Sequence, residues 1–161
     1  MAINFTPGQL RKTVGIGQET YRHWKKALAP LCREAGHSPC FTAGDLLATA
    51  IVRIMVIDYG VRVSALSALA DPLFAKCNEQ SWPSLERSLL LLDLSRKEVR
   101  LQSESIGIKV DSPAMVIPLR PQIDSLRRTL LAGDDDGGQT MFRFPPVAQP
   151  SDAACRKVSR S

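Results

Sequence analysis

Two short helical segments separated by Gly15 limit the folds that this chain can adopt. Thr6 can cap a helix with Pro7 at its first position and Gln9 three residues after the cap, which is the pattern of a capping box. The flexible backbone of Gly15 ends this helix after about Val14. Because so short a helix is not stable alone, it must pack on its neighbour. Two short helices joined by a glycine-containing turn form a helix-turn-helix unit.

The second segment, residues 15–26, has an apolar and a polar face. At helical spacing, Tyr21, Trp24 and Leu28 fall on one side. The other side carries polar and basic residues: Gln18, Arg22, Lys25 and Lys26. A basic face backed by aromatic anchors suits a helix that lies in a DNA groove. An ordinary amphipathic surface helix has the same pattern, so the neighbouring segments must decide between the two.

The charge distribution favours a polyanionic partner. The chain has 161 residues and a net charge of +5, and residues 1–62 hold 8 Lys and Arg against 4 Asp and Glu. A basic N-terminal part is typical of proteins that bind nucleic acid. With 44% hydrophobic residues, the chain can build one ordinary domain or two small ones.

Nothing in the sequence indicates a membrane segment. The longest apolar run, residues 46–57, contains Arg53 and is too short to span a bilayer. No basic segment followed by a long apolar stretch begins the chain, so we expect no signal peptide and a cytoplasmic location. Four scattered cysteines would stay free thiols in that compartment: Cys32, Cys40, Cys77 and Cys155.

After the second helix, prolines and Gly36 exclude a continuous helix over residues 29–41, which we interpret as a loop or a small hairpin of the size of a wing. Thr42 and Asp45 then repeat the capping pattern before a long apolar helix that ends at Gly60. Its residues Leu47, Ile51, Ile54 and Met55 are expected to face the first two helices. Ser64 is expected to cap a fourth helix that contains Leu66, Leu69 and Leu73. Pro72 should make this helix less regular.

This order of elements resembles the winged helix-turn-helix DNA-binding domain of the MerR family. The resemblance covers roughly residues 5–73 and rests on Thr20-Tyr21-Arg22-His23-Trp24, on Gly36-His37-Ser38-Pro39-Cys40-Phe41-Thr42-x-x-Asp45-Leu46 and on Gly60-Val61-Arg62-Val63-Ser64. It implies that Arg22 contacts the DNA backbone and that Gln18 and Glu19 reach base edges. Activation of transcription by reshaping promoter DNA is also implied by the resemblance alone.

The chain departs from the family pattern in two places. His37 and Ser38 stand where the family's wing usually presents an aromatic residue and an arginine, which shifts the expected phosphate contact towards Arg33. No heptad pattern follows residue 73, so the usual coiled-coil dimerisation helix is not expected. A dimer of this chain would have to form in another way.

Residues 82–132 predict a small antiparallel sheet with one helix. Residues 83–87 suggest a helical turn, residues 89–94 and 98–102 a hairpin, and residues 106–110 and 115–119 further strands, the last at an edge because of Pro118. A helix should begin at Pro121, place Ile123, Leu126 and Leu130 on one face, and end at Gly133. So small a unit should pack on a second copy or on the first domain.

The remainder, residues 133–161, has the composition of a disordered tail. Within it, residues 141–146 form an apolar island that suggests either a docking motif or an unselected extension. Arg156, Lys157 and Arg160 would add weak affinity for phosphates.

Catalytic and metal-binding patterns are weak. Cys32, His37 and Cys40 could ligate a metal, but a structural zinc site usually has four ligands and a short Cys-x-x-Cys hook, so no metal and no cofactor is predicted. Gly15-Ile16-Gly17 lacks the third glycine of a dinucleotide site and fits the turn better. No nucleophile with a base and no carboxylate pair is evident, so we do not predict an enzyme.

The sequence therefore predicts an α+β protein with a winged helix-turn-helix domain at residues 1–76, a dimerisation or partner-binding domain at residues 82–132 and a tail. The predicted function is sequence-specific binding of double-stranded DNA by a homodimer that regulates transcription. The predicted DNA-binding residues are Gln18, Glu19, Arg22, His23, Lys25, Lys26, Arg33 and His37. Two alternatives are an architectural factor of the excisionase type from a mobile element and an adaptor that binds RNA polymerase or another regulator.

Overall fold

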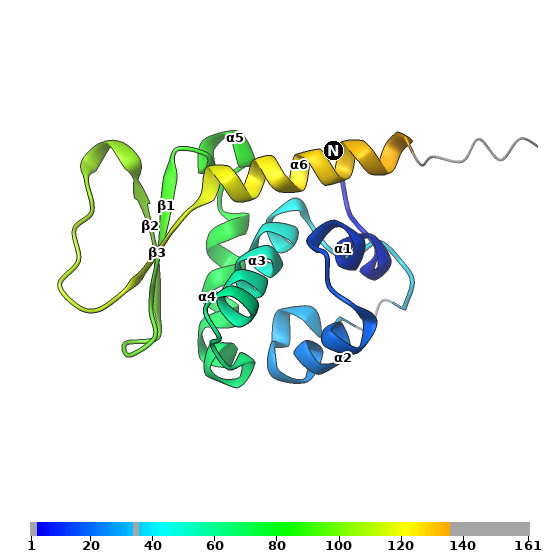
Figure 1. Cartoon of the computed structure of the whole chain (residues 1–161), viewed down its shortest axis with the longest axis horizontal. Helices are drawn as coiled ribbons and strands as arrows, with labels where there is room; N and C mark the ends of the chain where they lie inside the picture. Colours follow the sequence, from blue (N-terminus) through cyan, green and yellow to red (C-terminus); the bar gives the residue numbers. More distant parts are fainter. Residues whose placement is uncertain (1–2, 34–35, 136–161) are drawn as a thin grey trace, which may run out of the picture.

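Four helices form the N-terminal part of the chain (Figure 1). The computed structural model describes residues 3–33 and 36–135. In chain order these helices are α1 (Pro7–Val14), α2 (Gln18–Ala27), α3 (Ala43–Arg53) and α4 (Ser67–Asn78). Short 3-10 segments lie at Ala29–Leu31 and Val63–Leu66.

Both predicted capping boxes are confirmed. The Thr6 hydroxyl accepts a hydrogen bond from the Gln9 amide (3.2 Å), and the Thr6 amide donates to Gln9 Oε1 (2.8 Å). At the start of α3, the Asp45 amide donates to the Thr42 hydroxyl (3.1 Å) and the Thr42 amide to Asp45 Oδ2 (2.9 Å). Each box satisfies two N-terminal backbone donors that the helix itself leaves unpaired.

The long apolar helix ends near Gly60, as predicted. Helix α3 continues into a π-helical turn at Ile54–Asp58, and Gly60 has a left-handed backbone with φ of 67°. Leu47 and Met55 are fully buried, and Ile54 is half-buried. Glycine adopts this conformation without the steric penalty of a Cβ atom.

The prediction that Ser64 caps the fourth helix is wrong. The amide of Ala65 donates to the Arg62 carbonyl (2.9 Å), so the chain is already wound into a 3-10 turn when it reaches Ser64. Helix α4 starts at Ser67, whose hydroxyl donates to the Ser64 carbonyl (2.8 Å). Pro72 lies inside α4, where it leaves one backbone acceptor without its usual helical donor.

The segment between α2 and α3 is a loop. Its described part, residues 29–33 and 36–41, contains the 3-10 segment and one isolated bridge between Phe5 and Phe41, without a strand of its own. Phe41 is fully buried, and its carbonyl accepts from the Phe5 amide (2.7 Å). Of the two interpretations of this segment, a loop is therefore observed and a hairpin is not.

The C-terminal half contains an antiparallel sheet, as predicted, with three strands instead of the four expected. A short helix α5 (Trp82–Leu85) precedes β1 (Ser88–Asp93), β2 (Glu98–Ser103) and β3 (Met115–Pro118). The strand order is β2-β1-β3, with Leu90 opposite Leu101 on one side and Ile117 on the other. Pro118 therefore lies on an edge strand, where its missing N–H leaves no gap inside the sheet.

The prediction of a strand at residues 106–110 is wrong. After β2 the chain forms a 3-10 turn at Glu104–Ile106 and then an unpaired segment. Strand β1 already has a partner on each side, so the chain has to cross from the end of β2 to the start of β3. We call residues 104–114 the crossover segment.

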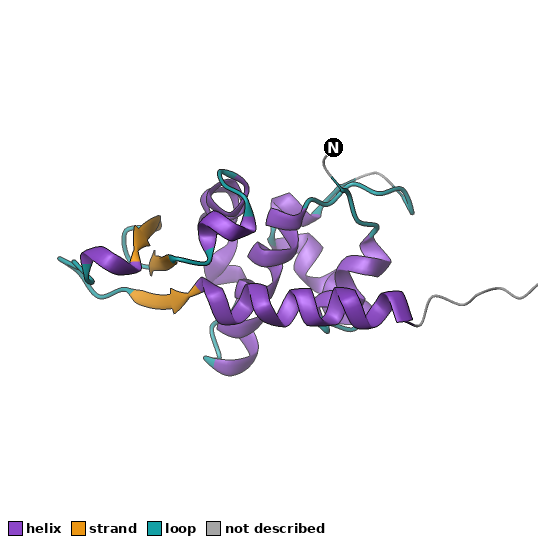
Figure 2. Ribbon diagram, turned by 90° about the horizontal axis from the view of Figure 1, so that it is seen from above, coloured by secondary structure: helices purple, strands orange, loops and turns teal. Residues whose placement is uncertain are grey.

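Helix α6 (Leu119–Asp135) runs along α1 and α3 (Figures 1 and 2). It begins two residues before Pro121 and passes through Gly133, so both predicted ends are corrected. A glycine inside a helix costs only about 1 kcal/mol. Residues 133–135 of the predicted tail therefore belong to α6, and residues 136–161, including the apolar island at 141–146, lie outside the described residues.

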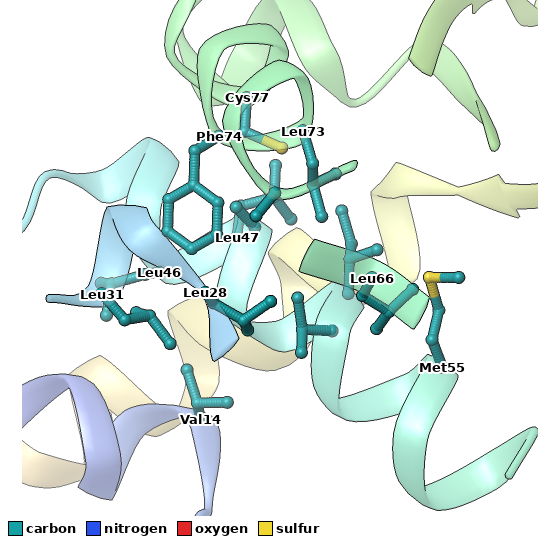
Figure 3. Packing of buried hydrophobic residues seen from close by; sticks show 14 of the residues in the cluster. Val14, Leu28, Leu31, Leu46, Leu47, Met55, Leu66, Leu73, Phe74 and Cys77 are labelled. Atoms are coloured by element: carbon teal, nitrogen blue, oxygen red, sulfur yellow. The ribbon is translucent and has the colours of Figure 1, made fainter. Parts of the chain in front are cut away.

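One continuous apolar core joins the helices and the sheet. It contains Leu10 of α1, Leu47 of α3, Leu73 of α4, Leu90 of β1 and Leu126 of α6. Figure 3 shows part of this core, where Val14 of α1, Leu47 of α3 and Phe74 of α4 lie among the side chains that are labelled. Of the two packings expected for residues 82–132, the structure has the one on the N-terminal part, and the mixed α+β fold is confirmed.

In the part of the chain that the structure describes, every helix is too short or too polar to cross a membrane.

Candidate nucleic-acid interface

Helices α1 and α2 are joined by a tight turn at Gly15, Ile16 and Gly17. Gly15 has φ of 76°, and the amides of Gly15 and Ile16 both donate to the Arg11 carbonyl, at 2.9 and 3.0 Å. The Ile16 side chain is buried, which fixes the turn on the core. Because glycine tolerates positive φ, the chain can reverse within three residues and present α2 beside α1.

Helix α2 has the two faces that its spacing predicts. Tyr21 and Trp24 are buried, with 7% and 2% of their surfaces exposed. On the opposite side, the exposed residues are Gln18, Glu19, Arg22, His23 and Lys26, and Lys25 is half-buried. Two aromatic anchors hold the helix against the core and leave its basic face in solvent.

A pocket of about 570 Å³ lies between α1, α2 and the loop that follows α2. We call it the basic groove. Its cationic or ionisable side chains come from three segments: Arg11, Arg22, Lys25, Arg33 and His37. No carboxylate is among the described residues that line it, and Gln18, Tyr21 and Cys32 complete its polar walls. Such a concentration of positive charge attracts anions.

Arg33 is fixed in place by contacts on several sides. Its guanidinium forms an ion pair with Asp45 (3.0 Å) and donates to the carbonyls of Pro30 (3.2 Å) and Cys40. It also stacks over the Phe41 ring at 5.1 Å. About a third of the Arg33 side chain stays exposed, so its first role is to hold the loop.

Asp45 links the loop between α2 and α3 to the helices α3 and α4. Its carboxylate is 1% exposed and accepts a hydrogen bond from Asn78 Nδ2 at the end of α4 (3.0 Å). Gly44 allows this close approach, because a Cβ there would lie 2.4 Å from Asn78 Oδ1. The start of α3, the end of α4 and the loop are thus locked together behind the groove.

Two contacts modify the charges on α2. Arg22 pairs with Glu19 at 2.9 Å, but both side chains are largely exposed, so solvent screens this pair and a phosphate can replace it. The Lys25 ammonium lies 5.7 Å from the centre of the Tyr21 ring.

Burial, followed by the nearby Cys40 thiol, raises the pKa of Tyr21, so its hydroxyl remains a neutral donor at physiological pH.

The structure divides the predicted DNA-binding residues into two groups. Gln18, Arg22, Lys25, Arg33 and His37 line the basic groove, and Glu19 joins them through Arg22. His23 and Lys26 instead line a separate pocket with Arg62.

Sequence reasoning missed Arg11. Leu10 and Val14 are buried at helical spacing, and this periodicity turns Arg11 away from the core and towards the groove. Pro7, one turn earlier, lines the same wall. The helical pattern predicts that Arg11 is directed away from the core, whereas its place beside α2 depends on the turn at Gly15.

The candidate metal ligands of the loop were Cys32, His37 and Cys40. Among residues 3–33 and 36–135, no three His, Cys, Asp or Glu side chains gather closely enough to hold an ion. Cys32 and Cys40 are free, and Cys155 lies outside the described residues.

Comparisons of the chain with models of protein families, with curated proteins and with solved structures find no match. The resemblance to the MerR family therefore stays a prediction from the motifs.

Proposed function

We propose that this protein binds double-stranded DNA through the basic groove and the exposed face of α2. The observation that carries the proposal is the gathering of Arg11, Arg22, Lys25 and Arg33 in one pocket whose described lining residues include no carboxylate. Contacts to phosphates provide most of the affinity of DNA-binding proteins and require this kind of surface.

The residues of the interface take different roles. Arg11, Arg22 and Lys25 bind phosphates, because their charges converge in the groove and their side chains are long enough to follow the DNA backbone. Gln18 lies in the first turn of α2 and is exposed, and in this proposal it contacts base edges in the major groove, with Glu19 beside it. Arg33 adds a contact from its exposed part while it holds the loop.

The protein would act in the cytoplasm as a homodimeric transcription regulator. Helix-turn-helix proteins commonly read two half-sites with two copies of the same helix. Activation in the manner of the MerR family rests on the motif resemblance alone. Selection of bound fragments from genomic DNA tests this part, because promoter sites with two-fold symmetry support it and an absence of enriched sites contradicts it.

Alanine variants in the groove test the DNA contact. In a fluorescence-anisotropy titration with a DNA duplex, Arg22→Ala and Arg11→Ala should each weaken binding about tenfold, the effect of losing one charge-assisted hydrogen bond. The slope of log K against log salt should fall by about 0.9 for each lost phosphate contact.

Arg128→Ala is the matched control for these variants. It removes one positive charge from an exposed position on α6, outside the residues that line the groove. It should leave both affinity and slope almost unchanged. Equal losses in all three variants would mean that net charge, and not the groove, governs binding, and normal binding by Arg22→Ala and Arg11→Ala would refute the assignment.

A further inference from the structure

The wall of the basic groove contains a buried hydroxyl group without a protein partner. Tyr21 is only 7% exposed and lines the groove. Its hydroxyl makes no hydrogen bond to any residue that the structure describes. Buried polar groups are almost always hydrogen-bonded, because an unpaired one costs free energy. The groove therefore has to supply the partner of this hydroxyl, either as water or as a ligand.

Two cations of the same groove also lack a counter-ion. Arg11 and Lys25 line the groove and are half-buried, and neither forms an ion pair with a residue in the described part of the chain. The Lys25 ammonium has only its contact with the Tyr21 ring, at 5.7 Å from the ring centre. A charge that is partly removed from water is stabilised by an opposite charge beside it. An anion in the groove would provide that charge.

The Tyr21 hydroxyl lies near two guanidinium groups. Burial, followed by the nearby Cys40 thiol, raises the pKa of Tyr21, whereas the charges of Arg11 and Arg33 lower it. Charges shift a pKa when they are close to the titrating group, so both arginines belong to the surroundings of the hydroxyl. Helix α1, helix α2 and the loop after α2 each contribute one of these three side chains.

Arg33 is held in place and still has donors to offer. Its guanidinium contacts the Asp45 carboxylate (3.0 Å) and the carbonyls of Pro30 (3.2 Å) and Cys40. A guanidinium has five N–H donors, and these three contacts leave at least two of them for a ligand. A side chain that is already fixed loses little conformational entropy on binding. This part of the groove is therefore preorganised.

We propose that one phosphate group binds in the basic groove between the Tyr21 hydroxyl, Arg11 and Arg33. We call this place the phosphate seat. The hydroxyl donates a hydrogen bond to one phosphate oxygen, and the two guanidinium groups donate to the others. Lys25, over the ring of Tyr21, adds a further positive charge. Tyr21 thus binds the ligand in addition to packing on the core.

A phosphate group fits these donors better than a carboxylate group. Its oxygens are arranged tetrahedrally, so donors that approach from three segments of chain can each reach a different oxygen. A carboxylate has only two oxygens, which lie in one plane with its carbon atom. Arginine is also the side chain that most often binds phosphate through several hydrogen bonds at once.

The inference rests on the proposed function in one respect, because the backbone of bound DNA is one source of such a phosphate. A small phosphate ion or a phosphate monoester is the other source and has the same chemistry. A DNA duplex and inorganic phosphate, used as separate probes, distinguish the two sources.

Tyr21→Phe tests the phosphate seat with a DNA duplex. It removes the hydroxyl and keeps the ring that packs on the core. In a fluorescence-anisotropy titration, the dissociation constant should rise about tenfold, the effect of losing one hydrogen bond to a charged group. The slope of log K against log salt should stay unchanged, because a neutral phenol releases no counter-ion. Arg11→Ala should lower both the affinity and the slope.

Tyr59→Phe is the matched control. Tyr59 is the other tyrosine of the chain, is 63% exposed and lies outside the residues that line the groove, so its variant should bind DNA normally. Thermal unfolding separates binding from packing. Since the Tyr21 hydroxyl makes no hydrogen bond within the described fold, Tyr21→Phe should melt within about 2 °C of the wild type.

Inorganic phosphate provides the second probe. The full chain is titrated with sodium phosphate and, separately, with sodium chloride at equal ionic strength, while backbone amide chemical shifts are recorded. For a seat that takes a small phosphate, the amides of Arg11, Tyr21 and Arg33 should show saturable shifts with phosphate alone, and Tyr21→Phe should weaken this binding about tenfold.

Weaker DNA binding by Tyr21→Phe with an unchanged salt slope assigns the seat to a backbone phosphate, and an effect on inorganic phosphate alone assigns it to a small ligand. Normal binding of both probes by Tyr21→Phe overturns the proposal, and so does a loss of affinity that is accompanied by a large fall in melting temperature. Arg22→Ala tests the DNA contact independently of the seat, so the proposed function can hold where this inference fails.

Discussion

Replacement of Asp45 by asparagine should destabilise the protein by about 2–3 kcal/mol. The buried carboxylate receives three donors: the Thr42 amide at 2.9 Å and Arg33 Nη2 at 3.0 Å reach Oδ2, and Asn78 Nδ2 at 3.0 Å reaches Oδ1. An asparagine has one acceptor oxygen and an NH₂ group, so at least one donor would face another donor. Asn78 cannot simply turn its amide, because its Nδ2 also donates to the Phe74 carbonyl (2.8 Å).

The magnitude follows from two terms. A buried donor left without an acceptor costs about 1–3 kcal/mol. Loss of the charge opposite Arg33 adds at most about 1 kcal/mol, because Arg33 is 36% exposed and solvent screens the pair.

Urea unfolding followed by circular dichroism measures the effect. With a slope near 2 kcal/mol per molar, the midpoint should fall by about 1–1.5 M. Asp71→Asn is the matched control, because Asp71 is an exposed aspartate on α4 and should change stability by less than about 0.5 kcal/mol. If Asp45→Asn unfolds at the same urea concentration as the control, Asp45 does not lock the loop to the helices.

Three further predictions concern the packing and stability of the folded chain. Gly44→Ala should destabilise the protein by about 3 kcal/mol in thermal unfolding, because its Cβ would lie 2.6 Å from the backbone oxygen of Cys77; an unchanged melting temperature would contradict the close packing of α3 and α4. The hydrogen bond from the Ser112 hydroxyl, followed by backbone amides, lowers the pKa of Asp93 below its ordinary value. The stabilisation is therefore present above the unfolded-state pKa and is lost as pH falls through the folded-state pKa. The stability difference between wild type and Ser112→Ala should thus shrink below about pH 4, and a difference independent of pH would exclude this linkage. Burial raises the pKa of the Cys77 thiol to about 12, so iodoacetamide near pH 8 should label the exposed Cys32 and reach Cys77 only after unfolding; peptide mass spectrometry showing the reverse order would refute the burial.

The elements that the sequence predicts well are those with local causes. The capping boxes at Thr6 and Thr42 depend on residues three positions apart, and the burial of Tyr21 and Trp24 follows from helical spacing alone. Each of these signals lies within one or two turns of chain, so no knowledge of the tertiary fold is needed to interpret it.

The elements that it predicts poorly depend on distant partners. Ile106–Val110 has the pattern of a strand, but Ile106 ends a 3-10 turn, Gly107 has a positive φ of 75°, and the chain crosses here from β2 to β3 on the other side of β1. The interpretation of Gly133 as a helix end gave weight to a local propensity, but α6 continues through Gly133 to Asp135.

In the candidate site, too, some features follow from local spacing and others depend on residues far apart in the chain. Helical spacing places Gln18 and Arg22 on the exposed face of α2, and both line the groove. Arg11 joins them only because α1 and α2 are brought together by the turn at Gly15. The link between Arg33 and Asp45 spans twelve positions of chain and cannot be deduced from spacing.

Backbone amide chemical-shift mapping with a DNA duplex of about 20 base pairs, long enough for two half-sites, tests the central claim most directly. The account predicts that the largest shifts lie at Arg11, in the turn at Gly15 and at Gln18 and Arg22. The amides of the crossover segment, including Lys109, should remain unchanged by DNA. If the shifts instead cluster on the sheet, or if no amide of α1 or α2 responds, the basic groove is not the DNA-binding surface.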